Sequence, residues 1–507
     1  MLTGCAERSA PAASDTILRR GNGGEPGTLD PQLADDSASL AILADLYEGL
    51  TRETAHDGLE GGAAAEWTVT ANGRALSFRL REGLRWSNGD GLTAEHFAAG
   101  LRHALDPATA APNAGWLAAI ERIETPAPGR LELHLSRADP ALAAILALPV
   151  AAPRHPLLSD DAAKRPVNGA YRLLEWKPHR HVKLARNEHY RDAAHVSIAR
   201  VTYVPVEDLD MELRSYRGDL IDLTSEVPNA RLDWVRANLP GELHVSPLLA
   251  TYGYALNFTR LAHGTRAAPR DVAALSRALS LAVDRERLVS RITGAGEQPA
   301  YGWVPDGFPF QQPARYAWAD MAATARREEA RRTLASWSAG APPPRTLTLC
   351  TDASENHRRT ALAVADMWRE ALGIELRLRE MEWKVFLAMR RAPQECDLVR
   401  LGWSADYLDA AGFLEIFVSH HPQNTLGYSS PGFDSLYRAA DETVDPRQRA
   451  QGLALAESRL LEEGAVIPLF FRVSKRLVKP RVRGDFGDPL GRLPTRNLLL
   501  RSSSGRS

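Results

Sequence analysis

The stretch 346–378 reads as a strand, a helix and a second strand, and this order limits the possible folds more than any other feature of the chain. Residues 346–349 alternate between threonine and leucine directly after the prolines 342–344 and Arg345. Apolar residues then recur at helical spacing until Gly373 ends the pattern, and 374–378 alternate again. A helical connection of this kind places its two strands parallel or nearly so. Strand-like and helix-like segments alternate elsewhere too, which predicts a mixed α/β protein.

The length and charge of the chain narrow its class. At 507 residues it exceeds what one hydrophobic core accommodates, so we expect about two to four domains. No segment repeats at a fixed period, which disfavours solenoids and propellers. The 62 basic and 63 acidic residues nearly cancel, so the charge offers no surface for nucleic acid. No apolar run reaches the roughly 18 residues that a membrane span requires.

Three cysteines are present, and they suggest two different roles. Cys350 and Cys396 lack the short spacing of a zinc or redox motif, and we expect both to be free thiols that serve in packing. Cys5 ends the string Leu-Thr-Gly-Cys, which resembles the lipobox of bacterial lipoproteins, or matches it by chance. An Ala/Ser/Pro-rich stretch follows, so residues 1–16 read as a tether from a lipid anchor. The basic and apolar regions of a signal peptide are missing, and we expect the true start to lie upstream of Met1.

Catalytic motifs are missing from the sequence. The phosphate-binding pattern GxGxxG begins at Gly21 and at Gly294, but Pro26 and Pro299 occupy its last glycine position. No Walker loop, HExxH motif or GxSxG elbow occurs. The histidine clusters at 179–181 and 420–421 adjoin prolines, which favours exposed loops over a metal site. We therefore expect no enzyme, no metal and no cofactor.

One ordered set of motifs is specific. The segment 76–89, LSFRLREGLRWSNG, followed by LTAEHF at 92–97, reads as a strand, a glycine turn covered by Trp86, and a helix capped by Thr93. It resembles the signature of the bacterial solute-binding proteins that serve peptide and nickel importers. Further blocks follow in the same order, and the last of them are similar to the oligopeptide-binding branch: 29–31, 46–50, 168–171, 277–285, 382–384, 400–407, 477–480 and 495–497. The resemblance covers roughly residues 17–500.

The resemblance implies an α/β periplasmic-binding-protein fold with two lobes, an extra domain and a hinge of two crossing strands. It implies the following division of the chain: lobe I from 17–48, 165–247 and 475–501, a small inserted domain II from 49–164, lobe III from 248–474, and a disordered tail at 502–507.

The resemblance also implies a function. The chain would be the substrate-binding component of an ABC transporter, a monomer of the periplasm or cell envelope that captures oligopeptides between its lobes. Its partners would be the permease and ATPase subunits, and only a lipid anchor would attach it to the membrane. Two alternatives stay open, namely a peptide or murein-peptide sensor or chaperone with the same fold, and the binding of nickel or haem.

A general peptide carrier must address the backbone and termini of its ligand, because side chains vary. By resemblance, Asp35, Asp36 and Ser37 of lobe I and Gly402, Trp403 and Ser404 of lobe III would hydrogen-bond an extended peptide. Asp406 matches the family carboxylate that meets the peptide α-ammonium, a role that competes with that of a surface acid.

The peptide carboxylate would meet a cation in lobe III. Strand alternation places the Arg400 side chain on the face of Gly402 and Ser404. Three kinds of residue complete the predicted site by resemblance: Arg390 and His357 for C-terminal carboxylates, Trp383 and Trp403 for side-chain pockets, and Glu226 for a preference toward basic peptides. The adjacent Arg391 leaves the register of Arg390 open by one. The family disulfide between the positions of Ala250 and Ser404 is absent.

Overall fold

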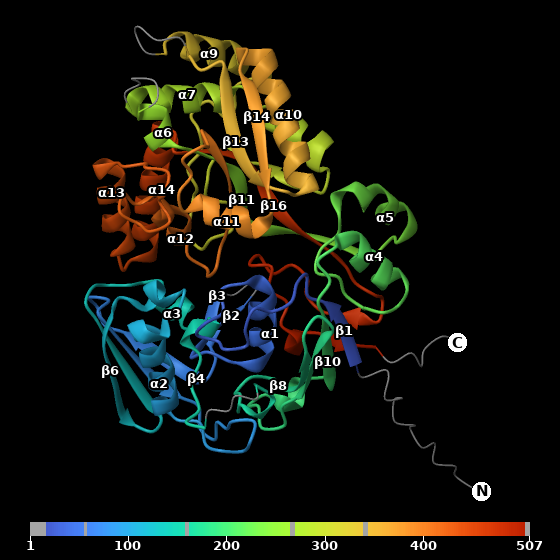
Figure 1. Cartoon of the computed structure of the whole chain (residues 1–507). Coiled ribbons are helices and arrows are strands. Elements are labelled where there is room, and N and C mark those ends of the chain that lie inside the picture. The colour runs from blue at the N-terminus through green and yellow to red at the C-terminus, as the bar shows by residue number, and fades with distance from the viewer. Residues whose placement is uncertain (1–16, 55–57, 158–161, 264–268, 338–342, 502–507) are drawn as a thin grey trace, which may run out of the picture.

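The computed structural model describes residues 17–54, 58–157, 162–263, 269–337 and 343–501. The chain forms two lobes, one above the other in Figure 1, and the long strands β11 (Leu243–Leu256) and β16 (Val466–Leu477) run between them. No helix in these ranges is both long enough and apolar enough to cross a membrane.

The upper lobe is built on a six-stranded sheet in the order β12-β16-β11-β15-β13-β14. The remaining strands of this sheet are β12 (Gln298–Pro299), β13 (Thr346–Asp352), β14 (Glu375–Met381) and β15 (Leu398–Ser404). Helices α7 (Pro269–Leu281), α9 (Ala323–Ala335) and α10 (Glu355–Leu372) cover one face, and α12 (Ala411–Leu414), α13 (Pro431–Asp441) and α14 (Pro446–Glu463) cover the other. The lobe also contains α6 (Phe258–His263), α8 (Arg285–Arg287) and α11 (Trp383–Arg390).

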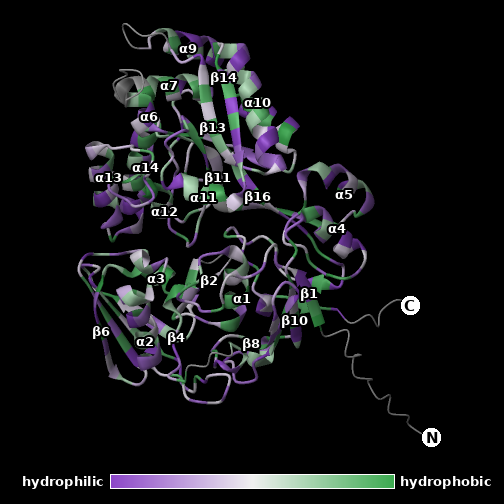
Figure 2. Ribbon diagram, viewed as in Figure 1, coloured by the Kyte–Doolittle hydropathy of each residue, from purple (hydrophilic) through white to green (hydrophobic). Residues whose placement is uncertain are grey.

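The predicted strand–helix–strand unit is confirmed. Strands β13 and β14 pair in parallel, and α10 connects them. Gly373 ends this helix in the left-handed region at φ 68°, a conformation that a glycine adopts without a steric penalty. Hydrophilic and hydrophobic residues alternate along β14 in Figure 2, which suits an edge strand with one face toward solvent.

Cys350 and Cys396 form a disulfide, so the prediction of two free thiols is wrong. The two residues lie 46 positions apart, which no short-spacing rule detects. Strand pairing brings them together, because β13 and β15 are parallel neighbours at Leu349–Leu398 and Cys350–Val399. The bond links β13 to the segment that leads into β15, and both strands belong to the site described below.

The two crossing strands are antiparallel to each other. Residues 243–247 of β11 pair with 473–477 of β16, and the register shifts between Pro247 and Thr251 before pairing resumes within the upper lobe. An irregularity of this kind bends a strand pair and increases its local twist. The chain therefore passes between the lobes through two neighbouring strands that change direction at the same level.

The lower lobe contains a four-stranded sheet formed from segments that lie far apart in the sequence. Its order is β1-β10-β9-β8, with β1 (Ile17–Gly21) parallel to β10 (Arg200–Val204). The other elements of this part are α1 (Ser37–Leu46), β8 (Tyr171–Lys177), β9 (His181–Arg186), α4 (Leu209–Arg217), α5 (Leu232–Asn238), β17 (Val482–Arg483) and β18 (Leu499–Leu500). The C-terminal segment packs here, since Arg20 donates to the Leu493 carbonyl at 2.7 Å.

Beside this sheet lies a smaller unit with its own four-stranded sheet, β4-β5-β7-β6. Its elements are β2 (Thr51–Thr54), β3 (Gly58–Gly61), β4 (Ala64–Val69), β5 (Ala75–Leu80), α2 (Ala94–Leu105), β6 (Ile120–Ala127), β7 (Arg130–Leu135) and α3 (Leu142–Ile145). The interpretation of the signature segment is confirmed: β5 is followed by Gly83 at φ 71°, Trp86 is fully buried, and Thr93 is the N-cap of α2.

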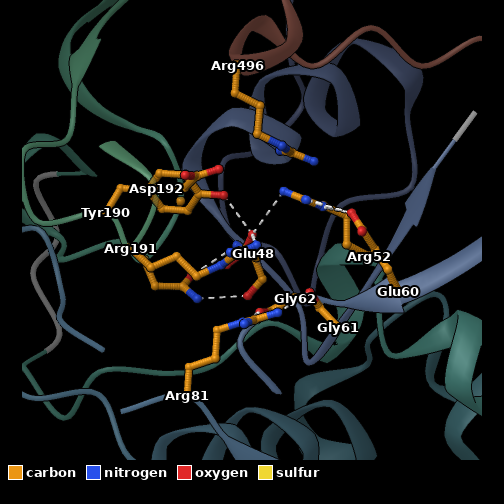
Figure 3. Close-up of polar contacts among 12 residues, drawn as sticks. Glu48, Arg52, Glu60, Gly61, Gly62, Arg81, Tyr190, Arg191, Asp192 and Arg496 are labelled. Carbon is orange, nitrogen blue, oxygen red and sulfur yellow. Dashed lines mark hydrogen bonds and ion pairs between the residues drawn. The ribbon is translucent and has the colours of Figure 1, made fainter. Parts of the chain in front are cut away.

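A buried glutamate joins the small unit to the lower lobe. Glu48 accepts hydrogen bonds from the Tyr190 hydroxyl at 2.7 Å and from Arg191 at 2.7 and 2.9 Å. Figure 3 shows these side chains and Arg52 converging on it. A buried carboxylate is tolerated only when such partners replace water. Within this cluster, the Glu48–Arg52 ion pair at 3.8 Å is the contact that reaches the small unit.

Candidate ligand-binding site

One edge of the central strand β15 is open. Its inner edge pairs with β11 along the whole strand, from Ser404 opposite Ala250 to Leu398 opposite Leu256. On its other side β13 pairs only with Leu398 and Val399. Among the described residues, no strand covers the edge from 400 to 404 on that side. Unused N–H and C=O groups on a strand edge are a template for an extended peptide.

Gly402 lies in the middle of this edge. A Cβ atom at this position would come within 3.2 Å of the Arg400 Nη1 atom. Any larger residue would therefore crowd the arginine, and the glycine leaves the strand accessible. Ser404, at the end of the strand, is exposed, and it lies opposite Ala250, as the resemblance implied for the family disulfide.

The open edge leads to Asp406, whose side chain is partly buried. In the described part of the chain, its carboxylate makes no hydrogen bond and no ion pair. Burial raises the pKa of Asp406, and the positive charge of Arg492 opposes this shift while the carboxylate of Glu53 adds to it. A partly desolvated carboxylate without a partner is a natural receptor for a cation.

Three parts of the chain meet around Asp406. Glu53, on β2 of the small unit, accepts a hydrogen bond from the Leu408 N–H at 2.9 Å and forms an ion pair with Arg492. Arg492, from the C-terminal segment, also donates to the Asp406 main-chain carbonyl. Neither Glu53 nor Arg492 was predicted as a site residue, because their contacts span 355 and 439 positions of sequence.

The predicted carboxylate receptor, Arg400, is already paired within the protein. Its Nη2 atom lies 2.7 Å from a carboxylate oxygen of Asp352, at the end of β13, and the two side chains are only 10% and 12% exposed. The His357 ring lies 3.0 Å from the same carboxylate. The guanidinium also packs against the rings of Phe386 and Trp383, at 4.9 and 5.6 Å from their centroids. Asp352 is therefore a further candidate site residue, which the sequence did not reveal.

Arg400, Asp352 and His357 form one group of contacts, called here the Arg400 cluster. The ionisation of each member follows from its neighbours. Burial alone would raise the pKa of Asp352, but the hydrogen bond with His357 and the charge of Arg400 hold it at about 2. Burial lowers the pKa of His357, which the contact with Asp352 offsets only in part. At neutral pH the cluster therefore contains one carboxylate, one guanidinium and a neutral imidazole.

His357 and Glu226, which were predicted for different purposes, line one open pocket of about 540 Å³. Tyr252, Arg472 and Lys475 also line it. The Glu226 carboxylate lies 3.4 Å from the Lys475 ammonium, so its charge is partly compensated. The pocket thus combines groups of both signs next to the Arg400 cluster.

Arg390 lies elsewhere. It lines a second pocket, of about 530 Å³, together with Val399, Leu401 and Tyr428. Burial lowers the pKa of Arg390, and the nearby charge of Arg400 adds to the effect. Arg390 therefore lines a different pocket from the one that His357 and Glu226 line.

The lower-lobe segment 35–37 does not form a strand. Asp36 is the N-cap of α1, and its carboxylate accepts from the Ser39 N–H at 2.8 Å. Asp35 is exposed, and Ser37 begins the helix. The side chain of Asp36 thus has a structural role that accounts for its presence, while the main chain of Asp35 remains accessible.

The two tryptophans predicted to line side-chain pockets differ in their exposure to solvent. Trp383 is 49% exposed and stacks on Phe386, whereas Trp403 is partly buried against the cluster that includes α12 and α14. The predicted lipidation site Cys5 lies outside the described residues.

A sequence profile described as bacterial extracellular solute-binding proteins, family 5 Middle, matches residues 58–425. The chain belongs to this family. Among family relatives, the periplasmic oligopeptide-binding protein OppA of Salmonella typhimurium is 31% identical over 99% of this chain and 97% of its own. The periplasmic murein peptide-binding protein MppA of Escherichia coli is 28% identical over 91% and 88%.

Solved structures of family 5 proteins confirm the fold. The complex of Haemophilus influenzae OppA with RPPGFSPFR superposes with a TM-score of 0.80, at 28% identity over 96% of this chain and 99% of the other. The murein tripeptide-binding protein MppA of Escherichia coli gives a TM-score of 0.82, at 26% identity over 96% and 98%. The predicted α/β periplasmic-binding-protein fold with two lobes is therefore correct.

Proposed function

We propose that this chain is the substrate-binding subunit of an ABC importer for oligopeptides in the periplasm or cell envelope. The observation that carries the proposal is the open edge of β15, residues 400–404, which ends beside the unpaired carboxylate of Asp406. The relatives described above, which bind oligopeptides and murein peptides, agree with it. The proposal includes no catalytic step and no cofactor, and it assigns the permease and ATPase subunits as partners.

In this mechanism an extended peptide adds a strand to β15. Its main chain pairs with residues 400–404, and its α-ammonium meets Asp406 at the end of that edge. Main-chain pairing is independent of sequence, so side chains contribute through hydrated pockets such as the one lined by Glu226 and His357. Trp383 and Trp403 lie near the two ends of the same region.

We assign the peptide carboxylate to the Arg400 cluster. This role is supported by the position of Arg400 on β15, two residues before Gly402. Because Asp352 already neutralises Arg400, the carboxylate must compete for the guanidinium or reach His357 at the pocket rim. Arg390 remains a receptor only for ligands that extend past the strand.

The domain division is part of the proposal, and the separate hydrophobic cores support it. One core combines residues 18–46, 167–223 and 478–498, a second combines 50–151 with Tyr407, and three others lie within 249–470. A further core joins 213–235 to Ala295, Val473 and Leu477, where the crossing strand β16 passes between the lobes. Lobe I, domain II and lobe III would be these units. The lipobox at Cys5 is proposed as the membrane anchor.

Ligand release requires that the lobes separate. Among the described residues, contacts across the opening include the Arg137–Asp441 ion pair at 2.9 Å, the edge-to-face packing of Trp116 on Tyr407, and the contacts of Glu53 with Leu408 and of Arg492 with Asp406. These contacts are local, so ligand binding can bias the equilibrium between open and closed states. Small-angle scattering should show a smaller radius of gyration with saturating peptide than without it. An unchanged radius, together with an open ligand-free envelope, would contradict closure.

The direct test is identification of the ligand. The protein would be purified from its native host, denatured, and its released ligands analysed by mass spectrometry. We expect peptides of varied sequence with free α-amino groups. Calorimetry with synthetic peptides, each free or N-acetylated, then tests the terminal contact. Recovery of haem, a nickel chelate or no peptide at all would overturn the proposal, and recovery of murein peptides alone would narrow it.

A further inference from the structure

A second acid and an arginine accompany the Asp406 carboxylate, and their arrangement is asymmetric. The side chain of Glu53 is only 6% exposed, and both of its oxygens are used, one by the Leu408 N–H and one by Arg492. Arg492 divides its donors between the Glu53 carboxylate and the Asp406 main-chain carbonyl. The arginine therefore touches the backbone of Asp406 while its charge is directed to Glu53.

We propose that Glu53 holds Arg492 away from the Asp406 carboxylate, and so determines that the site accepts a primary ammonium group. This inference rests on the proposed function, in which Asp406 receives the α-ammonium. Without the Glu53 carboxylate, Arg492, which is 32% exposed and already touches the Asp406 main chain, would be free to turn to the Asp406 carboxylate, with Asp488 as the other acid near it. The arginine would then occupy the position intended for the ligand.

The local charge count supports this role. Glu53 and Asp406 contribute two negative charges and Arg492 one positive charge, which leaves one negative charge to meet one α-ammonium. Glu415 also interacts with Asp406, but burial raises the pKa of Glu415 to about 8, so it is mostly neutral at pH 7. A buried site that becomes neutral on binding avoids the large desolvation cost of an unpaired charge.

The neighbouring acid does not change this balance. Asp488 interacts with both Glu53 and Arg492, and its own pKa is raised by burial and lowered by Arg492 and Arg476. Burial lowers the pKa of Arg476 to about 10, so it remains charged at neutral pH. The charge of Arg476 thus offsets that of Asp488, and neither residue is among the groups that shift the pKa of Asp406.

The arrangement also links ligand choice to closure. Glu53 comes from β2 of the small unit, whereas Asp406 and Leu408 follow β15 in the upper lobe. The Glu53–Leu408 hydrogen bond therefore exists only when these parts are together. Arg492 is oriented correctly in the closed state, at the moment when the ammonium is enclosed.

The experiment compares the wild type with Glu53→Gln, Arg492→Gln and the double variant. Each protein is titrated by calorimetry with one tripeptide, either free or N-acetylated. Glutamine keeps the size of the Glu53 side chain and can still accept the Leu408 N–H, and at position 492 it removes the guanidinium while leaving a polar side chain. Glu60→Gln is the matched control, because Glu60 on neighbouring β3 also pairs with an arginine, Arg52, but lies away from Asp406.

We expect the wild type and Glu60→Gln to prefer the free peptide by at least about 30-fold, the lower bound for a buried charge pair. Glu53→Gln should lose about tenfold or more of this preference. Arg492→Gln should keep it, since the Asp406 carboxylate then has no competing cation. The double variant should recover a preference within about threefold of the wild type, although it has two substitutions.

The recovery separates this role from a merely structural one, because removing a second contact would otherwise weaken binding further. Thermal melting of all five proteins identifies a variant that fails to fold. If Glu53→Gln does not fold, Arg492→Gln and the double variant still test the inference, because both should prefer the free over the N-acetylated peptide to the same degree. A Glu53→Gln protein that discriminates like the wild type, or a double variant no better than Glu53→Gln, overturns the inference alone. A wild type that ignores acetylation overturns the proposed function and this inference with it.

Discussion

The two ends of the open strand edge differ in how their charges are balanced. At one end Asp406 has an unpaired carboxylate in a partly buried setting, with one net negative charge around it. At the other end Arg400 is paired with Asp352 at 2.7 Å and needs no ligand for neutrality. One end therefore lacks a cation, whereas the other is complete before any peptide arrives.

The difference indicates how one carrier can require a free N-terminus and still accept peptides of different length. An unpaired buried charge makes its ligand partner nearly obligatory, because leaving it unmet is costly. Arg400 is already paired, so a peptide carboxylate gains only the difference in free energy between its own ion pair with Arg400 and the one with Asp352. The peptide N-terminus should therefore dominate affinity, and peptides of different length should be accepted at the other end.

The largest effect is expected from Asp406→Asn. The variant keeps the side-chain shape but leaves the peptide ammonium without a counter-ion, which typically costs about 2–5 kcal/mol, or about 30-fold to several-thousand-fold in affinity. Calorimetry of free and N-acetylated peptides on both proteins forms a double-mutant cycle. Asp233→Asn, which removes a fully exposed acid, is the control. A coupling energy near zero would remove Asp406 from the site.

The second effect concerns the Arg400 end. The disulfide closes a loop of 46 residues, and the chain-entropy relation gives a loss of about 4 kcal/mol in the free energy of unfolding when both cysteines are replaced by alanine. Urea titration of the oxidised wild type against Cys350→Ala/Cys396→Ala measures it. Because the bond lies beside Asp352 and β15, contacts to the peptide carboxylate should weaken while the preference for a free α-amino group remains. Loss of that preference instead would contradict the separation of the two ends.

The third effect comes from Asp352→Asn, which leaves Arg400 without its internal partner. In the wild type, amidation of the peptide C-terminus should reduce affinity by less than about threefold, since Arg400 is already neutralised. In the variant a free carboxylate becomes the best available partner, and we expect the preference for acid over amide to reach about tenfold or more. Peptide acids and amides of matched sequence provide the measurement. Equal affinities in the variant would show that the carboxylate binds elsewhere.

The smallest change is expected from pH. Burial raises the pKa of Asp406, so as the pH falls the carboxylate is protonated earlier than an ordinary aspartate, and the contact with the ammonium is lost. Protonation of Asp406 by itself should then weaken the binding of free peptides by at most about tenfold per pH unit. Burial also raises the pKa of Glu53, so its protonation releases Arg492 and acts in the same direction. The pKa of Asp352, held at about 2, keeps that carboxylate ionised above pH 4, and N-acetylated peptides should show no such decline.

Local patterns in the sequence predicted much of the fold. The unit of β13, α10 and β14 followed from alternation, helical spacing and Gly373, all of which act over a few residues. The position of Asp406 followed from a motif that continues directly from β15. Such features are visible because the residues that determine them are neighbours in the chain.

The remaining site residues depend on contacts between distant segments. Asp352 is recognised only when β13 lies beside β15, and Glu53 only when the small unit meets the upper lobe. The disulfide was mispredicted for the same reason, since it depends on strand pairing. Asp36 illustrates the opposite case, because capping α1 accounts for its carboxylate without any ligand.

The parallel pairing of β1 with β10, together with the contact of Arg20 with Leu493, has a consequence for the order in which the protein folds. That contact joins residues 473 positions apart, so the first strand cannot make it until one of the last segments has been synthesised. Contacts of such separation form late, because the entropy of closing the intervening loop must be overcome first. The upper lobe can gather its core from nearer segments, whereas the lower lobe is completed only when nearly the whole chain is available. A chain with this topology stays incompletely folded until its synthesis is almost finished. Until then it can still pass through a narrow channel as an extended chain.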